Sequence, residues 1–294
     1  MRPISSLISK LRQLDDVLAR VRSIQEAVGR VEARQLFRAP ISSLSQAEFR
    51  VFSQWGEDGI IQRLIQEVPI DRRIFVEFGV QDYQESNTRF LLMHDNWAGM
   101  VIDGDQGNID RIRQDEIFWR YNLKTECAFV KRDNINDLLK NNGIVGDIGL
   151  LSIDIDGNDY WVWEAIEAVR PRIAVVEYNA RFGPHRAVTV PYDAGFTRAR
   201  AHYSMIYYGA SLPALVSLGT RKGYDFVGAN SAGNNAFFVR RDLRPSSLPA
   251  RPVAEGFVAS QFRESRGENG QLMFLTVEEK QRILKDLPLV EVPA

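Results

Sequence analysis

The stretch FVEFGVQD (residues 75–82), followed one βα unit later by MVIDGD (residues 100–105), decides the expected fold. Each is an apolar run that ends on an acidic or glycine-bearing turn and is followed by a segment with a helical pattern. An open parallel sheet builds a nucleotide site in this way, at the carboxyl ends of its strands. Gly79 lets the backbone approach a ligand closely, and Asp103 can accept hydrogen bonds from two ribose hydroxyls. The pair therefore indicates an adenosyl-type ligand.

The composition is that of an ordinary globular protein. The 294 residues are 45% hydrophobic and 26% charged, which predicts one large domain or one domain with an appendage. A net charge of -1 gives no overall field that would favour nucleic acid or an anionic membrane. Cys127 is the only cysteine, so no intramolecular disulfide can form. With no apolar run of about 18 residues and no signal-peptide core, a cytoplasmic location is expected.

Residues 1–36 carry a seven-residue repeat. Its expected core positions are Ile4, Leu7, Leu11, Leu14, Leu18, Val21, Gln25 and Val28. Spacings that alternate between three and four predict a coiled coil, formed with a second copy of the chain or with a helix of another protein. The alternative is an amphipathic helix packed on its own domain. Residues 37–50 are predicted to be a linker, because Pro40 and a cluster of serines break the repeat.

Residues 51–245 are predicted to form an α/β domain. Apolar runs indicate strands at 74–79, 99–103, 128–131, 148–154, 173–177, 224–228 and 236–240. The last two are separated by a few turn residues and must be antiparallel, whereas a dinucleotide-binding sheet is wholly parallel. The predicted fold is therefore a doubly wound, mostly parallel seven-stranded sheet that ends in an antiparallel hairpin. Residues 246–294 are expected to be an extension with a helix from about Thr276, which forms a capping box with Glu279.

Three motifs now resemble a known family. VEFG (76–79), IDGD (102–105) and LLSIDIDGND (150–159) are similar to the signature regions of the FkbM-like S-adenosylmethionine-dependent methyltransferases, a branch of the class I methyltransferases. The resemblance covers roughly residues 50–245. It implies methyl transfer from S-adenosylmethionine and, as the preferred acceptor class, a sugar. The fingerprint G-x-G-x-x-G is absent, which counts against a nicotinamide cofactor.

The resemblance also implies a cofactor site. The residues it assigns to that site are Gln54, Glu77, Gly79, Ser86, Asn87, Thr88, Asp103, Gly104, Asp133, Asn134 and Asp154. The helix start at 86–88 would receive the methionine carboxylate, because free N–H groups favour an anion, although it could be a plain N-cap. Asp133 and Asn134 would reach the adenine, or could form a simple turn. Gln54 would fold over the cofactor.

Acidic residues at the ends of two neighbouring strands suggest the chemistry. Asp154 and Glu177 are the candidate catalytic carboxylates, and His185 is the candidate histidine base. Methyl transfer to a hydroxyl requires removal of its proton, by a carboxylate of raised pKa or with help from a divalent cation. Asp154, Glu177 and Asn179 offer oxygen ligands suited to Mg²⁺. Asp156 and Asp159 could instead serve a tight turn and a helix start.

The sequence thus predicts a cytoplasmic O-methyltransferase that acts on a small molecule or glycan precursor, with no nucleic-acid partner and with self-association or a helix partner through residues 4–34. Two alternatives stay open. One is an NAD-dependent sugar oxidoreductase. The other is an assembly protein whose domain binds S-adenosylmethionine without turnover.

Overall fold

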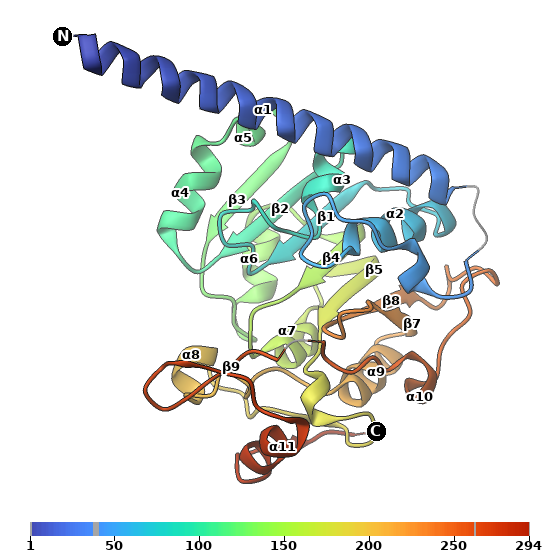
Figure 1. The fold of residues 1–294 in the computed structure, drawn as a ribbon. Helices are drawn as coiled ribbons and strands as arrows, with labels where there is room; N and C mark the ends of the chain where they lie inside the picture. Colours follow the sequence, from blue (N-terminus) through green and yellow to red (C-terminus); the bar gives the residue numbers. More distant parts are fainter. Residues whose placement is uncertain (1, 38–40, 262, 294) are drawn as a thin grey trace.

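The centre of the molecule is a seven-stranded sheet with the order β3-β2-β1-β4-β5-β8-β7 (Figure 1). The computed structural model describes residues 2–37, 41–261 and 263–293. Strands β1 to β5 are parallel, and β8 is antiparallel to both of its neighbours. The strands are β1 Ile74–Phe78, β2 Ala98–Asp103, β3 Leu123–Cys127, β4 Gly146–Ile153, β5 Val169–Glu177, β7 Tyr224–Ala229 and β8 Asn235–Arg240. This confirms the predicted fold class, the class I methyltransferase arrangement.

Helices cover both faces of the sheet because its strands are buried on both sides. In β1, Phe75 packs into one apolar layer and Val76 and Phe78 into the other. The first layer lies beneath α2 (Glu57–Glu67), α3 (Arg89–His94), α4 (Gln106–Gln114) and α5 (Glu116–Arg120). The second lies beneath α6 (Ile135–Asn141), α7 (Asp159–Ala165) and α9 (Leu212–Arg221). Chain order reverses between β1 and β4, and a crevice forms at such a switch point.

The predicted third strand, 128–131, is wrong. The strand is Leu123–Cys127, and the apolar run that follows it is a loop. β3 is the edge strand, so only one of its faces is well covered and its sequence alternates with polar residues. The continuous apolar run was mistaken for the strand because Ala128, Phe129 and Val130 line a cavity instead of entering the sheet.

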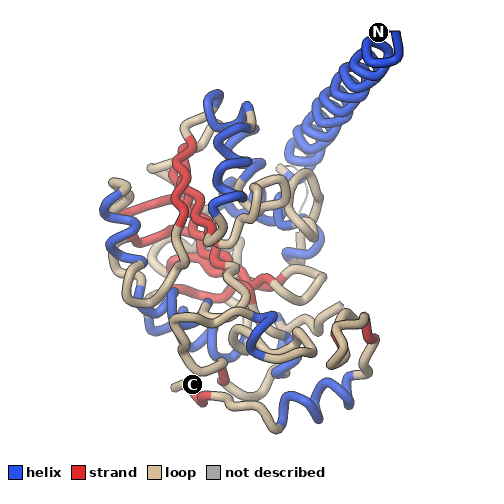
Figure 2. The backbone as a smooth tube through the Cα atoms, turned by 90° about the vertical axis from the view of Figure 1, so that its left-hand side faces the viewer, coloured by secondary structure: helices blue, strands red, loops and turns tan. Residues whose placement is uncertain are grey.

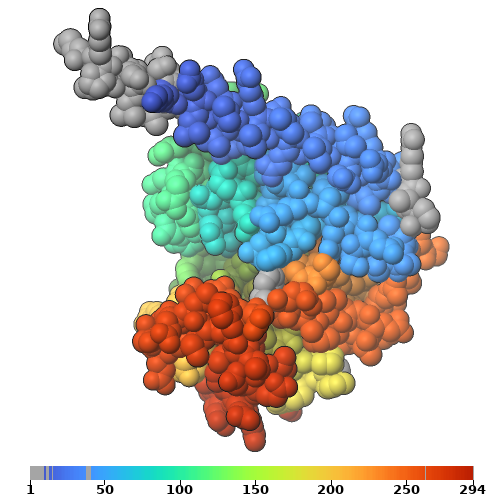
Figure 3. All heavy atoms as spheres, in the orientation of Figure 1, coloured from blue at the N-terminus to red at the C-terminus, as the bar shows by residue number. Residues whose placement is uncertain are grey.

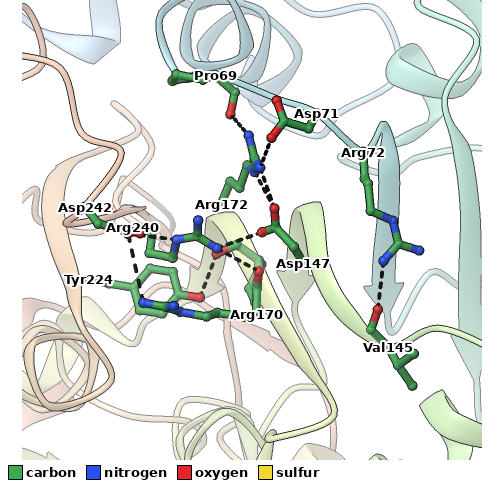
Figure 4. A network of polar contacts seen from close by, with 11 residues as sticks. Pro69, Asp71, Arg72, Val145, Asp147, Arg170, Arg172, Tyr224, Arg240 and Asp242 are labelled. Carbon is green, nitrogen blue, oxygen red and sulfur yellow. Dashed lines mark hydrogen bonds and ion pairs between the residues drawn. The ribbon is translucent and has the colours of Figure 1, made fainter.

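An ion-pair network ties together the amino ends of β4 and β5 and the end of β8 (Figure 4). The carboxylate of Asp147 accepts hydrogen bonds from Arg172 Nε at 2.8 Å and from Arg240 NH1 at 2.7 Å. Burial favours a raised pKa for Asp147, but the two guanidinium groups hold that pKa below its ordinary value. Both arginines are buried, so the network fixes these three strands at the edge opposite the strand ends that carry the motifs.

Residues 2–36 form one long helix, α1 (Arg2–Leu36), which crosses the α2 and α3 side of the domain and extends beyond it (Figures 1 and 2). Its second half is docked through Ala33 and Leu36, which are buried, and Gly29 lies against Val51 and Phe90. Gln25, an expected coiled-coil core position, donates a hydrogen bond to Val51 O of the domain. Ile4, Leu7 and Leu11 have side chains outside the described residues. Within the described residues of the chain, no helix combines the length and apolarity needed to cross a membrane.

The described residues of the C-terminal extension, 246–261 and 263–293, lie over the lower part of the molecule, in orange and red in Figure 3. They contain α10 (Val253–Gly256), β9 (Ser265–Arg266), β10 (Leu272–Met273), α11 (Val277–Lys285) and β11 (Val290–Glu291). The capping box of Thr276 and Glu279 starts α11, as the sequence predicts. β11 pairs with β6 (Val188–Thr189), and Tyr178 of the loop after β5 donates a 2.7 Å hydrogen bond to Val258 O. The segment is therefore part of the folded domain.

Candidate functional site

A cavity of about 490 Å³ opens where β1, β2, β4 and β5 end. Its position follows from the reversal of chain order between β1 and β4. Nine of the residues singled out from the sequence line it: Gln54, Glu77, Gly79, Ser86, Asn87, Asp103, Gly104, Asp154 and Glu177. The structure thus brings together groups that are up to 123 positions apart in the chain.

Gly79, directly after β1, lies in close contact with the backbone at the end of β4. Its φ angle is +73°, and a Cβ atom there would lie 1.8 Å from Asp154 O. Any side chain would therefore strain the backbone and push the two strand ends apart. Glycine is needed here to build the floor of the cavity.

Asp103 ends β2 and lines the cavity. Its Oδ2 accepts a 2.8 Å hydrogen bond from Gln81 N, and its Oδ1 accepts from Asp105 N and Asn108 Nδ2, both at 2.9 Å. These bonds fix the carboxylate between the loops that follow β1 and β2. Because a carboxylate offers about four acceptor positions, one remains for a ligand hydroxyl.

The helix start at 86–88 is not an open anion site. The carboxylate of Glu77 accepts hydrogen bonds from Asn87 N at 2.8 Å, from Thr88 N at 3.1 Å and from the hydroxyl of Thr88. The N–H of Ser86 donates to Phe52 O. Burial raises the pKa of Glu77 to about 7. The expectation that these N–H groups receive a methionine carboxylate is therefore wrong, because a carboxylate of the chain already occupies them.

Two predicted adenine contacts also lie elsewhere. Asp133 is 71% exposed and pairs with Arg132. The side chain of Asn134 accepts from Lys131 N and donates to Phe129 O, so it closes a turn. Neither residue lines the cavity, because the strand before them ends at Cys127 rather than at 131. Phe129 and Val130 take the place expected for them on the cavity wall.

Three carboxylates meet at the ends of β4 and β5. Oxygen atoms of Asp154, Asp159 and Glu177 all lie within 4.8 Å of one another. Burial raises the pKa of Asp154 well above its usual value, and the charges of Asp156 and Asp159 raise it further. Burial, and then the charge of Asp154, raise the pKa of Glu177 in the same way. The three carboxylates therefore favour sharing a proton or a cation.

The three acids differ in how far their oxygens are already used. Asp159 begins α7 and accepts hydrogen bonds from Ile155 N and Gly157 N, both at 2.9 Å, so it shapes the loop before the helix. Glu177 is only 7% exposed, and its Oε2 is buried without a hydrogen-bond partner among the residues that the structure describes. Asp154 and Glu177, which line the cavity, are consequently the pair best placed to act on a ligand.

Two further predicted residues, Asn179 and His185, do not line the cavity. Asn179 is fully buried, its amide donates to Ile206 O and Tyr208 O, and its Oδ1 accepts from Arg181 N. Its side chain holds the loop after β5, and the third carboxylate beside Asp154 and Glu177 is that of Asp159. His185 is exposed and does not line the cavity, since its loop turns outward after η2 (Ala180–Phe182).

The cavity wall also contains residues that the sequence did not assign to a site, among them Asn158, Phe196, Arg198 and Asn235. Arg198 starts α8 (Arg198–Ala201), donates a 2.8 Å hydrogen bond to Asp156 and lies 4.0 Å from the centre of the Tyr208 ring. Asn235 faces Glu177 across the β5–β8 pair and donates to Glu57. The predicted hairpin could have identified Asn235, because an antiparallel strand begins beside the end of its neighbour.

The segment before α2 closes one side of the cavity. Asp58 Oδ2 accepts hydrogen bonds from the backbone N–H groups of Val51, Phe52 and Ser53, at 2.7 to 2.8 Å. This folds the chain back on itself and presents Gln54 at the cavity. Burial raises the pKa of Asp58 to about 6 despite these bonds. The role of Asp58 is therefore to shape the entrance segment.

No protein-family model and no curated protein matches this chain. Solved structures of similar fold include the N-terminal domain of EvdMO1 with SAH bound, at 10% identity, 72% of this chain, 94% of that chain and a TM-score of 0.42. A S-adenosylmethionine-dependent methyltransferase from Clostridium acetobutylicum has 9% identity over 62% of this chain and 89% of that chain, with a TM-score of 0.39. TrmK from M. capricolum in complex with SAH has 9% identity over 69% of this chain and 76% of that chain, with a TM-score of 0.38. Because these scores lie below 0.5, the fold assignment rests on the strand order itself.

Proposed function

We propose that the chain is an S-adenosylmethionine-dependent O-methyltransferase whose acceptor is a hydroxyl of a sugar, a glycan precursor or a related small molecule. One observation carries the proposal: a single cavity joins Asp103 at the end of β2 to the adjoining carboxylates Asp154 and Glu177. The first end suits a ribose, and the second suits a group that must lose a proton. O-methylation from a nucleoside donor requires both.

The cavity is compatible with the cofactor. Its volume of about 490 Å³ lies within the range of roughly 300–1,000 Å³ that is typical of small-molecule sites. Asp103 would accept hydrogen bonds from the ribose, and the bare backbone at Gly79 would allow close approach. S-adenosylmethionine, when bound, supplies a methyl group on a sulfonium sulfur. Gln54, Ser86 and Asn87 would contact the rest of the cofactor through their side chains.

The chain's own contribution to the reaction would be to remove the proton of the acceptor hydroxyl. A carboxylate is a weak base toward an alcohol, and a raised pKa makes it a stronger one. Asp154 lines the cavity beside Glu177, whose Oε2 has no hydrogen-bond partner within the described ranges. We assign Asp154 as the group that accepts the proton, with its pKa kept high by burial and by the charges of Asp156 and Asp159, and Glu177 as its neighbour in the site. Arg198 and Phe196 would contact the acceptor.

The same acidic cluster offers a second way to activate a hydroxyl. Asp154, Asp159 and Glu177 present hard oxygens within 4.8 Å of one another, which suits Mg²⁺ in part. Asp159 already accepts two backbone hydrogen bonds, so the set falls short of a full octahedral shell. Methylation by enzyme dialysed against a chelator, with and without added Mg²⁺, separates the two: a rate that depends on Mg²⁺ assigns the cluster to a cation.

Binding and turnover test the proposal separately. Calorimetry with S-adenosylmethionine and with NAD should give saturable binding of the first alone. Transfer of labelled methyl from S-adenosylmethionine to a panel of sugars and nucleotide sugars should then identify an acceptor. Binding of NAD alone would favour an oxidoreductase. Binding of S-adenosylmethionine without transfer to any acceptor would favour the assembly role. In the domain division that goes with this proposal, residues 1–36 mediate assembly, 37–50 are a linker, 51–245 are the catalytic domain and 246–294 are a C-terminal extension.

A further inference from the structure

Helix α1 leaves a continuous apolar face uncovered. Six large apolar side chains on it are each 50% to 63% exposed. They are Leu14, Val17, Val21, Ile24, Val28 and Val31. Their spacings are three, four, three, four and three, which is an uninterrupted seven-residue repeat. We call this set the α1 seam. It differs from the register expected from sequence, which ran through Leu18 and the polar Gln25.

The other side of the same helix is fixed to the domain. A Cβ atom on Gly29 would lie 2.4 Å from Val51, so the helix backbone is in close contact there. Ala33 and Leu36 are buried on the same side, and Leu36 O accepts a 3.0 Å hydrogen bond from Arg63. At 3.6 residues per turn, the seam lies about 130° around the helix from this docked side. The domain therefore holds the seam in a fixed direction and does not obstruct it.

No other described element of the chain can cover the seam. It runs over 18 residues, or about 27 Å at 1.5 Å per residue. The next longest helix within the described ranges is α2, with 11 residues, and its apolar side is buried against the sheet. A narrow apolar stripe with a heptad repeat fits another helix of similar length by knobs-into-holes packing. The chain itself provides such a helix in each further copy.

We propose that α1 is a self-association element that pairs its seam with the same seam of a second copy of the chain. A self-complementary surface of this kind closes around a two-fold axis. In a parallel pair, the positions flanking the seam place Arg20 opposite Gln25 and Ala27 opposite Glu32, so no like charges meet. Gln25 flanks this seam rather than interrupting it, since the domain backbone accepts its hydrogen bond.

The pairing has a consequence for the domain. The same Gln25 side chain bonds Val51 O, which belongs to the segment that Asp58 folds and that presents Gln54 at the cavity. An associated α1 would keep that segment in place from outside. The proposal does not rest on methyl transfer, because the seam and its docking contacts exist whatever the cavity binds.

The test is the mass of the full-length chain in solution, by light scattering across micromolar concentrations. We expect a multiple of the 33.5 kDa single-chain mass, and the single-chain mass itself for the double variant V21D/I24D. Ser23→Asp is the matched control, because Ser23 is an exposed residue on the same helix away from the seam and should leave the mass unchanged. Far-ultraviolet circular dichroism and S-adenosylmethionine calorimetry check that the variants fold.

Two results would overturn the proposal. One is a wild-type chain that stays at the single-chain mass, and the other is a V21D/I24D variant that keeps the wild-type mass. Vesicles of phosphatidylcholine and phosphatidylserine provide the competing test, because an apolar helical face flanked by arginines can also bind a lipid surface. A monomeric wild type that floats with these vesicles, while V21D/I24D does not, would assign the seam to membrane binding and refute self-association.

Discussion

Replacing Gly79 with alanine should both destabilise the domain and damage the site. The φ angle of +73° costs a non-glycine residue about 1–2 kcal/mol. The new Cβ would also lie 1.8 Å from Asp154 O, which is a backbone atom that cannot move aside alone. Such overpacking typically costs a further ~1–3 kcal/mol. We therefore expect G79A to lower the free energy of unfolding by roughly 2–5 kcal/mol.

Gly223 provides a matched control. Its φ angle is +84°, yet a Cβ atom there would have no heavy atom within 4 Å. Gly223→Ala should therefore show the conformational cost alone, about 1–2 kcal/mol. The difference between the two variants isolates the close approach of β1 to β4.

Urea unfolding followed by circular dichroism measures both variants, with the midpoints compared at a common slope. S-adenosylmethionine calorimetry should show a weaker Kd for G79A and an unchanged Kd for G223A, since only the first displaces Asp154 O. If the two variants lose equal stability, the contact between the strand ends does not constrain the site and the reasoning about Gly79 fails.

Three further predictions follow from the site. Asp103→Asn should weaken S-adenosylmethionine binding about 10- to 100-fold, because a hydrogen bond to a charged group contributes roughly 1.5–3 kcal/mol. Asp133→Asn, which changes an exposed side chain, should leave the Kd unchanged. An unaltered Kd for D103N would remove Asp103 from the cofactor site. Asp154→Asn should slow methyl transfer about 10²- to 10⁴-fold while the Kd of S-adenosylmethionine stays within a few-fold, and wild-type rates in D154N would exclude Asp154 as the base. Glu77 has a pKa of about 7 in the folded state, against 4.5 for an unburied group, so between these values the folded state binds more protons than the unfolded state. Stability should therefore fall as pH rises from about 4.5 to 7, and the fall due to Glu77 is at most about 3 kcal/mol. The urea midpoint of E77Q should drop less between pH 5 and pH 8 than that of the wild type.

The sheet could be predicted because its central strands are continuous apolar runs bounded by turn residues. β1, β4 and the β7–β8 hairpin lie within one or two residues of the predicted ranges. The edge strand β3 could not be placed in this way, because one of its faces is poorly covered and its sequence alternates. β5 begins at Val169 and contains Pro171, before the stretch that pairs with β8. A proline is tolerated there because β8 pairs with β5 only from Ile173 onward, so no hydrogen bond to β8 needs an N–H group at residue 171.

The sequence predicted which polar side chains lie near the site, but not which hydrogen-bond partner each of them has. Glu77 and the helix start at 86–88 were both assigned to the ligand, but they bind each other. Asn179 was assigned to a metal, but it binds the loop after its own strand. Sequence places such groups at the right strand ends and does not reveal which of them fold the loops.

The groups left over are the ones that can act. Asp103 keeps an acceptor position beyond the three hydrogen bonds it receives, and Glu177 keeps a buried oxygen that receives none from the described part of the chain. An unfilled acceptor in a buried place costs free energy, so the fold tolerates it where a ligand, a proton or a cation supplies the missing contact. Asp154 joins Glu177 on these terms, since two adjoining buried carboxyls cannot both stay charged without such a contact. Asp58 Oδ1 is also buried without a partner among the described residues, but neither Asp58 nor Asp159 lines the cavity, and the carboxylate of Glu77, which does line it, is bound to the chain. Position at the cavity together with incomplete bonding therefore distinguishes the Asp154 and Glu177 pair from these structural carboxylates.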